Sequence, residues 1–241
     1  MVRDSREEWK TREGVFDQFT LRVLQRLSGA GHFDELARIA SPGKEATVFA
    51  ATRGGDGTAA VKIYRLETAT FSKMYAYIRV DPRYARLKNN QRQVIFAWAE
   101  REHRNLLLCR SANVRAPMPI AYRSNVLVME FIGHEQEPSP RLKQQAPDDP
   151  AAFAALTLRE IEKLSKAGLV HGDLSEYNIL NHDEEPVLID FSHSVTLEAP
   201  NSQELLERDV KNVVAYFTKL GVDIDEEKEL ARMRKAAPKR K

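Results

Sequence analysis

The stretch His171-Gly172-Asp173-Leu174-Ser175-Glu176-Tyr177-Asn178, followed by Leu188-Ile189-Asp190-Phe191, decides the fold of this chain. Asn178 comes five residues after Asp173, and Asp190 ends an apolar run. A polar turn after a helix would also place Asp and Asn close together, but it would leave the second carboxylate unexplained. Carboxylate and amide oxygens are the ligands that Mg²⁺ prefers, so the pattern predicts a metal site beside a further carboxylate.

This spacing matches the catalytic pattern of protein-kinase-like phosphotransferases. The pattern assigns Asp173 to orienting or deprotonating the group that accepts the phosphoryl, and Asn178 and Asp190 to holding the metal. We therefore expect ATP as the phosphoryl donor and Mg²⁺ as the metal, with Mn²⁺ as an alternative.

A buried cation is predicted on the strand Ala60-Val61-Lys62-Ile63. A lysine between apolar neighbours is costly to bury unless an anion faces it. Phosphate oxygens and one helix carboxylate would serve, although a single exposed strand lysine is common. Of Glu100 and Glu102, we select Glu102 because kinase helices place the pairing Glu four residues before a core leucine, here Leu106.

Two further segments are expected to bind the nucleotide. The strand Leu127–Ile132 leads into an interlobe linker, where the Glu130 carbonyl and the Ile132 N–H would meet the adenine edge, with Met129 behind the base. The turn 41–46 would contact the triphosphate, although it lacks G-x-G-x-x-G and has Glu45 where a P-loop needs Ser or Thr. Its candidate contact residues are Ser41, Gly43 and Lys44.

The fold class that follows is α+β, with the two lobes of a truncated protein kinase: a small β-rich N-lobe carrying one long helix, and a helical C-lobe. Residues 1–40 are interpreted as a helical extension and residues 41–132 as the N-lobe, which includes a flexible insertion at 66–92. Residues 133–225 form the C-lobe, and residues 226–241 a basic tail. Helices are predicted at about 15–27, 32–38, 93–110, 151–167 and 202–220, and hairpins at 46–64 and 117–131.

An activation loop is missing from this arrangement. Only eighteen residues separate Asp190 from Asp209, which already lies in the next predicted helix. Gly172 stands where many kinases have an arginine that reads a phosphorylated activation loop, and no Ala-Pro-Glu follows Asp190. A kinase that docks generic peptides is therefore not expected.

Composition sets the remaining bounds. The 241 residues carry a net charge of +2, but positions 79–123 hold ten basic against three acidic residues. This excess is read either as a solvated face or as a surface for a polyanion. The single cysteine, Cys109, lies in an apolar run and is expected to be buried. No membrane segment is apparent, and we expect a soluble, cytoplasmic protein.

These motifs resemble the RIO family of atypical serine/threonine kinases, in particular the first RIO subfamily in an archaeal-type minimal form. The similarity rests on the loop 41–46, on Trp98–Glu102 with Arg104-Asn105-Leu106, on 171–180 and on 206–210. It implies a truncated kinase domain binding ATP and Mg²⁺, serine autophosphorylation, and ATPase turnover through an aspartyl-phosphate at Asp190. It also implies a role in maturing the small ribosomal subunit, with the precursor particle and its RNA as partners.

Three positions depart from the family pattern: Pro42 replaces Thr, Thr47 replaces Asn, and His193 stands where Gln is usual. Two alternatives stay open. One is a small-molecule phosphotransferase of the aminoglycoside or choline kinase type, which uses similar motifs. The other is an ATP-binding scaffold on a ribosomal precursor.

Overall fold

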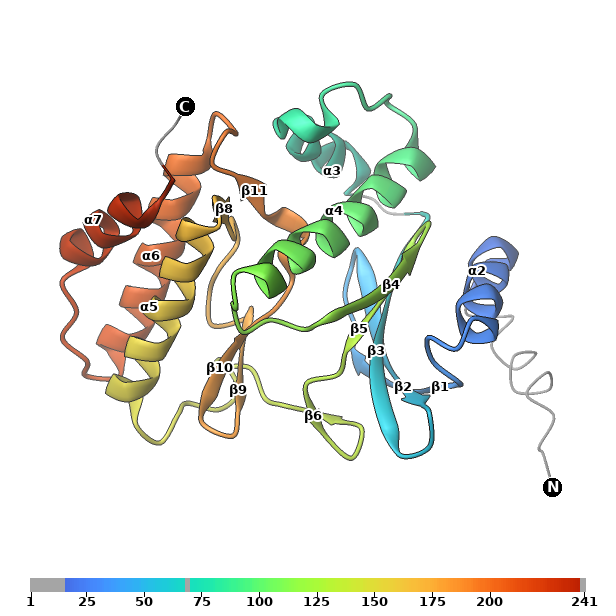
Figure 1. Ribbon diagram of the computed structural model, residues 1–241, viewed down its shortest axis with the longest axis horizontal. Coiled ribbons are helices and arrows are strands. Elements are labelled where there is room, and N and C mark those ends of the chain that lie inside the picture. Colours follow the sequence, from blue (N-terminus) through green and yellow to red (C-terminus); the bar gives the residue numbers. More distant parts are fainter. Residues whose placement is uncertain (1–15, 68–69, 239–241) are drawn as a thin grey trace.

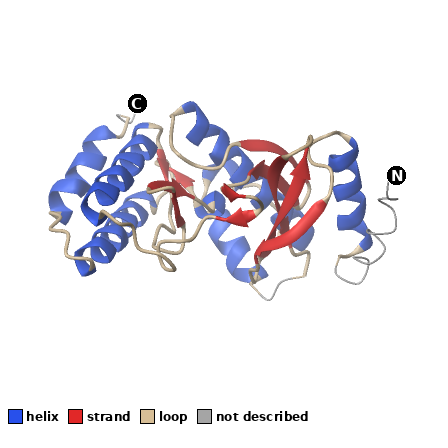
Figure 2. Ribbon diagram, turned by 90° about the horizontal axis from the view of Figure 1, so that it is seen from below, coloured by secondary structure: helices blue, strands red, loops and turns tan. Residues whose placement is uncertain are grey.

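The computed structural model describes residues 16–238 except 68 and 69. A sheet-based N-lobe and a mainly helical C-lobe lie at opposite ends of its long axis (Figures 1 and 2). This confirms the predicted α+β, bilobal arrangement. Expectations that concern residues 1–15 and the last three residues of the tail lie outside the described residues.

The N-lobe is built on one antiparallel sheet with the strand order β1-β2-β3-β5-β4. The strands are β1 (Leu36–Ser41), β2 (Ala46–Arg53), β3 (Gly57–Tyr64), β4 (Pro119–Arg123) and β5 (Val126–Glu130). Both predicted hairpins are present. Side chains alternate along a strand, so Val61 and Ile63 pack in one cluster with Leu24 of helix α2 (Gln18–Gly29), and Lys62 points to the opposite side.

The helix predicted at about 32–38 is wrong. Strand β1 begins at Leu36 and pairs with β2, where Ile39 lies opposite Phe49 and Ser41 opposite Val48. A segment this short has little helical preference of its own, and pairing along a sheet edge decides its conformation. The sheet therefore begins inside the segment that we assigned to the helical extension.

A long helix, α4 (Gln91–Ser111), covers the other side of the sheet and reaches toward the C-lobe (Figure 1). The insertion before it contains α3 (Phe71–Ile78) and a 3₁₀ turn, η1 (Pro82–Tyr84). Met74 and Ile78 of α3 are buried in one cluster with Trp98 of α4. The insertion thus has helix, as predicted, and a packed apolar side; its flexibility stays a prediction.

The C-lobe consists of helices around short strand pairs. The helices are α5 (Pro150–Lys166), α6 (Ser202–Lys219) and α7 (Glu226–Ala236). The strands are β6 (Gly133–His134), β7 (Glu137–Pro138), β8 (Leu169–Val170), β9 (Ile179–His182), β10 (Glu185–Leu188) and β11 (Val195–Thr196), with a 3₁₀ turn, η2 (Phe191–His193).

The interpretation of 226–241 as a basic tail is corrected by α7. Asp225 caps this helix by accepting a hydrogen bond from the Lys228 N–H, and Met233 is fully buried in the C-lobe core. One apolar side chain per turn on a charged helix is enough to dock it against α5 and α6. Cys109 is buried as expected. No helix among the described residues is both long and apolar enough to cross a membrane.

Candidate active site

The eleven residues predicted to bind nucleotide and metal or to act in catalysis line one cavity of about 720 Å³ between the lobes. They are Ser41, Gly43, Lys44, Lys62, Glu102, Met129, Glu130, Ile132, Asp173, Asn178 and Asp190. They come from the β1–β2 turn, β3, α4, β5 and two loops of the C-lobe. Residues up to 149 positions apart in sequence therefore face a single space large enough for a nucleotide.

Lys62 is the charged centre of the cavity. Its Nζ lies 2.9 Å from Oε1 of Glu102 and 2.9 Å from Oδ1 of Asp190. Tyr64, two residues along β3, donates its hydroxyl to the other Glu102 oxygen. Burial lowers the pKa of Lys62, but the Asp190 and Glu102 carboxylates outweigh burial and raise it, so the ammonium stays protonated. Glu100 pairs with Arg104 instead.

Asp190 lies two residues beyond the end of β10, immediately before η2, and its backbone is in the left-handed region with φ 65°. Ser192 donates its hydroxyl to the same Oδ1 that meets Lys62, at 2.7 Å. Burial raises the pKa of Asp190, but Lys62 and the Ser192 hydroxyl more than compensate and hold the pKa well below its usual range. Asp190 is therefore an ionised carboxylate that faces the cavity, which suits a ligand for a hard cation.

Asn178 and Asp173 are held together beside Asp190. The Asn178 Nδ2 donates to the Asp173 carbonyl at 2.8 Å and to its Oδ2 at 3.2 Å, which leaves the amide oxygen as the remaining ligand atom. The Ile189 N–H donates to the Asn178 carbonyl, so Asn178 lies next to the end of β10. Burial and the nearby Asp190 raise the pKa of Asp173, which brings it closer to that of a useful proton acceptor. The donor set fits Mg²⁺.

The catalytic loop, residues 171–178, is held by hydrogen bonds to a side chain of α6. Asp209 is buried and accepts hydrogen bonds from the N–H groups of Gly172, at 2.7 Å, and Leu174, at 2.9 Å. Gly172 has φ +80°, and a Cβ there would lie 2.9 Å from the His193 carbonyl oxygen. Any side chain at position 172, including that of arginine, would therefore strain this backbone conformation.

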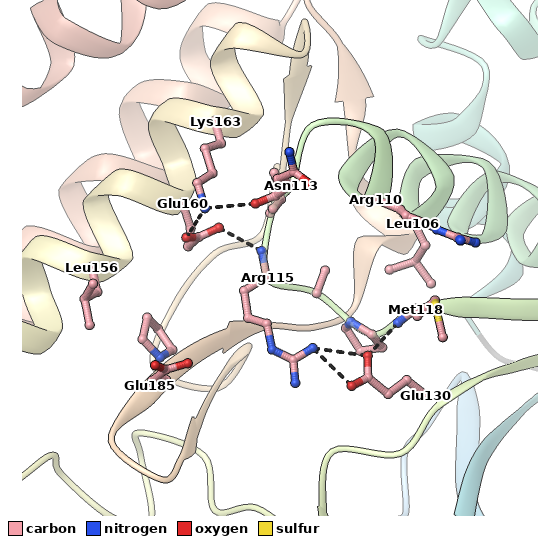
Figure 3. A pocket seen from close by; sticks show the side chains of 14 residues that line it. Leu106, Arg110, Asn113, Arg115, Met118, Glu130, Leu156, Glu160, Lys163 and Glu185 are labelled. Carbon is pink, nitrogen blue, oxygen red and sulfur yellow. Dashed lines mark hydrogen bonds and ion pairs between the residues drawn. The ribbon is translucent and has the colours of Figure 1, made fainter.

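Met129 of β5 and Ile132, two residues beyond the end of that strand, lie in the cavity wall, and both are buried. The Glu130 side chain is engaged elsewhere. Its carboxylate accepts from the Arg115 guanidinium at 3.1 Å and 3.2 Å and from the Met118 N–H at 3.0 Å. Figure 3 shows this pair in a second cavity of about 490 Å³, where the Arg115 N–H also bonds Glu160 of α5. Only the Glu130 backbone remains available for an adenine edge.

Three comparisons agree on the family. The family model described as the RIO domain matches residues 47–230. The RIO-type serine/threonine-protein kinase Rio1 of Haloferax volcanii is 40% identical over 91% of this chain and 76% of that protein. Rio1 of Methanocaldococcus jannaschii is 44% identical over 90% of this chain and 74% of that protein. The chain belongs to the RIO family of serine/threonine protein kinases.

Solved structures show the same fold at lower identity. The Rio2 kinase of Chaetomium thermophilum superposes with a TM-score of 0.71 at 20% identity, covering 93% of this chain and 69% of that one. A complex of the same kinase with ADP, Mg²⁺ and phosphoaspartate superposes with a TM-score of 0.66 at 19% identity, over 90% and 69%. The two archaeal relatives carry the Rio1 name, in agreement with the resemblance to the first RIO subfamily.

In this RIO kinase the phosphate loop, residues 41–46, has few contacts. Pro42, Gly43 and Lys44 are exposed. A Cβ on Gly43 would lie 2.5 Å from the Ala46 carbonyl oxygen, so the turn needs glycine there. Arg141 of the C-lobe donates to the Ser41 hydroxyl at 2.7 Å and also lines the cavity. Arg141, which lies between β7 and α5 and belongs to none of the motifs, was not identified from the sequence.

The contacts by which α4 holds residues 191–194, the turn that follows the candidate metal ligand Asp190, were also not identified from the sequence. Arg101 is fully buried, donates to the Ser192 carbonyl, and has its guanidinium carbon 4.4 Å from the Trp98 ring centroid. Asn105 donates its Nδ2 to the carbonyls of Phe191, at 2.9 Å, and Ser194, at 3.0 Å. The signal was present: polar residues fall on the face of α4 that also carries core side chains.

The side chains of His193, which also lines the cavity, and of Arg83 are both held by neighbouring residues. His193 packs edge-on against Trp98 and Tyr77, and burial lowers its pKa to about 4, so it is neutral at pH 7. Arg83 lies in the basic stretch 79–123, which was interpreted from the sequence either as a solvated face or as a surface for a polyanion. It pairs with the buried Asp81 at 2.6 Å and donates to Asn105 at 2.9 Å, so its guanidinium is engaged within the protein.

Proposed function

We propose that this RIO protein binds ATP with Mg²⁺ and transfers the γ-phosphoryl group. The observation that supports this most is the position of Lys62 between Glu102 and Asp190, in a cavity that also contains Asp173 and Asn178. A buried ammonium is costly unless anions face it, and Lys62 lies between two carboxylates at the wall of the cavity. Its role in this position is therefore to hold anions.

Each side chain then has a task. Lys62 draws phosphate oxygens into the cavity, and Glu102 fixes the rotamer of Lys62. Asp190 and Asn178 supply oxygen ligands for Mg²⁺, which neutralises charge on the phosphates when bound. Asp173 orients an acceptor hydroxyl and takes its proton. The backbone of Glu130 and Ile132, with Met129 behind them, receives the adenine, and Ser41, Gly43 and Lys44 contact the triphosphate.

For ATPase turnover we assign a covalent step to Asp190. A carboxylate oxygen of Asp190 attacks the γ-phosphorus, the bond from that phosphorus to the β-γ bridging oxygen breaks, and ADP leaves. Water then cleaves the acyl phosphate to regenerate the carboxylate and release phosphate. The phosphoaspartate named in the Rio2 complex supports this route. Transfer to a serine of the chain itself is the corresponding autophosphorylation.

Incubation with γ-labelled ATP tests the proposal. We expect label both in the protein and in free phosphate. Hydroxylamine cleaves acyl phosphates and leaves phosphoserine, so label removed by hydroxylamine reports Asp190 and the remainder reports serine. ATP binding without either product would support a scaffold, and label transferred only to an added aminoglycoside or choline would support the small-molecule alternative. RIO family membership favours the protein kinase.

The basic insertion supports a role on the small-ribosomal-subunit precursor. Between positions 79 and 92, four of its basic side chains are exposed: Arg79, Arg86, Lys88 and Arg92. Contacts to RNA phosphates release counterions, so binding should weaken as salt rises. Replacing the four with Gln should lower both the affinity for small-subunit ribosomal RNA and its salt slope. A matched control replaces four exposed basic residues outside the insertion, namely Arg53, Lys211, Lys219 and Lys228. Equal losses in both variants would mean that only net charge matters.

A further inference from the structure

Two histidines and an aspartate meet outside the nucleotide cavity. His134 Nε2 lies 3.0 Å from each carboxylate oxygen of Asp183, and His182 Nε2 lies 4.0 Å from Asp183 Oδ2. The two imidazole rings are stacked with centroids 5.1 Å apart. One ligand atom from each of the three residues lies within 4.8 Å of the others. None of the three has a role in the proposed phosphoryl transfer.

Two hairpins bring these side chains together. His134 precedes the turn of the β6–β7 hairpin, whose turn residues Glu135 and Gln136 have φ values of 47° and 70°. His182 and Asp183 lie at the turn of the β9–β10 hairpin. Such tight turns fix the position of the flanking side chains. The first hairpin follows the interlobe linker, and the second connects the two residues to which we assign Mg²⁺.

His182 is oriented by a neighbour. Its Nδ1 lies 2.8 Å from the Ser139 hydroxyl, and Ser139 is itself held by a backbone hydrogen bond from its N–H to the Ile132 carbonyl at 3.0 Å. With the proton on Nδ1 donated to Ser139, the Nε2 lone pair points toward Asp183. A hydrogen bond on the other ring nitrogen is the arrangement that metal-binding histidines use to fix tautomer and ring direction.

We infer that His134, His182 and Asp183 form a binding site for Zn²⁺ or a similar borderline transition-metal ion, with water as the fourth ligand. Bonds of about 2.1 Å in a tetrahedron put ligand atoms about 3.4 Å apart. The observed separations of 3.0 and 4.0 Å lie on either side of that value. His134 and Asp183 are each 68% exposed, so small rotations can adjust them. Two imidazole ligands also disfavour Mg²⁺, so this site and the nucleotide site should prefer different metal ions.

An ion here would tie the hairpin after the linker to the hairpin between Asn178 and Asp190. This follows from the positions of the ligands and does not depend on the protein being a kinase. The expected physical effect is a higher melting temperature in the presence of Zn²⁺, because an ion that binds only the folded state stabilises it by mass action.

The test is calorimetric titration of the tag-free protein with ZnCl₂ in millimolar Mg²⁺, which occupies oxygen-only sites. We expect one equivalent bound with micromolar affinity, weakened at least about tenfold by His182→Ala and by His134→Ala. His32→Ala is the matched control, because His32 lies in the N-lobe, far in sequence from the three ligands. The affinity of this variant for Zn²⁺ should equal that of the wild type. Titration with Co²⁺ should give the visible absorption of a tetrahedral ion in the wild type and in His32→Ala, and not in His134→Ala or His182→Ala.

No binding at a hundredfold excess over the protein, or equal affinity in the wild type and both variants, would overturn the site. In that case the contacts amount to a His134–Asp183 hydrogen bond on the surface. If the variants fail to fold, Ser139→Ala gives an independent reading: it removes the partner of His182 Nδ1 and should weaken Zn²⁺ several-fold while the protein remains folded.

Discussion

The catalytic loop and the phosphate loop face each other across the cavity and are held in different ways. The catalytic loop is supported by buried polar side chains: Asp209 binds two of its N–H groups, and Ser194 donates to the His171 carbonyl at 2.9 Å. The phosphate loop is exposed at residues 42–44 and meets the other lobe through the hydrogen bond between Arg141 and Ser41.

The difference follows from what each loop must do. Groups that meet charge as it develops during transfer work best when the fold positions them in advance, since reorganisation would then add nothing to the barrier. A loop that covers the triphosphate must let the nucleotide enter and leave, so a strong fixed network would slow turnover. Changes to the first region should therefore affect chemistry or stability, and changes to the second should affect nucleotide affinity.

The largest effect is expected at the junction of the two regions. Asp190→Asn removes the charge that meets Lys62 and the proposed metal, and should lower phosphoryl transfer by about 10³-fold. The side chain of Asp190 is 40% exposed, so the fold should survive. Rates of label transfer, together with melting curves, check this. Transfer at the wild-type rate in the purified variant would contradict the assignment.

Variants of Lys62 and of the two helix carboxylates sharpen this result. Lys62→Met should lower transfer to a similar extent, but it leaves Glu102 buried without its cation and should destabilise the fold. The double variant Lys62→Met with Glu102→Gln should recover stability and stay inactive. Glu100→Gln is the control, because Glu100 pairs with Arg104 on the helix surface and should leave both rate and melting temperature nearly unchanged.

Most of the candidate site residues could be identified from the spacing of motifs in the sequence. Asp173, Asn178 and Asp190 are close in sequence, and Lys62 is a cation between apolar neighbours. Glu102 was selected over Glu100 because it lies four residues before Leu106, so all five candidates come from the sequence. Arg141, Arg101 and Asn105 act through backbone carbonyls or a hydroxyl from distant segments. The positions of Arg101 and Asn105 on the core face of α4 indicate that they are buried, but their partners, like that of Arg141, depend on tertiary packing.

In the fold, too, local sequence predicts some elements, and tertiary contacts determine others. Alternating and helical patterns gave the hairpins and the long helices at nearly their observed bounds. Strand β1 (Leu36–Ser41) and helix α7 (Glu226–Ala236) were misread because each is short and mostly exposed. Pairing with β2 determines the first, and the single buried Met233 docks the second. Neither partner is visible in the segment itself.

A smaller effect, on stability, is expected from breaking the support of the catalytic loop. In Asp209→Asn the amide nitrogen would face one of the two backbone N–H donors of Gly172 and Leu174, leaving a buried donor unpaired. The free energy of unfolding should fall by about 1–3 kcal/mol, measured by urea titration. A change in turnover with no change in stability would contradict the role of Asp209 as a support.

The pH dependence of that loss is also set by the structure. Burial raises the pKa of Asp209 to about 7, against the opposing hydrogen bonds from Leu174 and Gly172. The folded state then holds a proton that the unfolded state, with a pKa of about 3.9, has released. Stability from this group is present at low pH and is lost as pH rises through about 7. The difference between the wild type and Asp209→Asn should therefore be larger at pH 5 than at pH 8.

The smallest effect is expected at the phosphate loop. Arg141→Gln removes the guanidinium that bonds Ser41 across the cavity, and should raise the KM for ATP by about three- to tenfold with little change in kcat or melting temperature. Ser41→Ala distinguishes two ways in which Arg141 could lower the KM for ATP. If Arg141 acts by holding the phosphate loop, the KM of the double variant is no higher than that of either single variant. If Arg141 contacts phosphate directly, Arg141→Gln raises the KM more than Ser41→Ala does. Arg38→Gln is the control, since Arg38 joins the lobes through an exposed ion pair with Glu137 and should leave KM unchanged. An unchanged KM in Arg141→Gln would mean that the phosphate loop needs no support from the C-lobe.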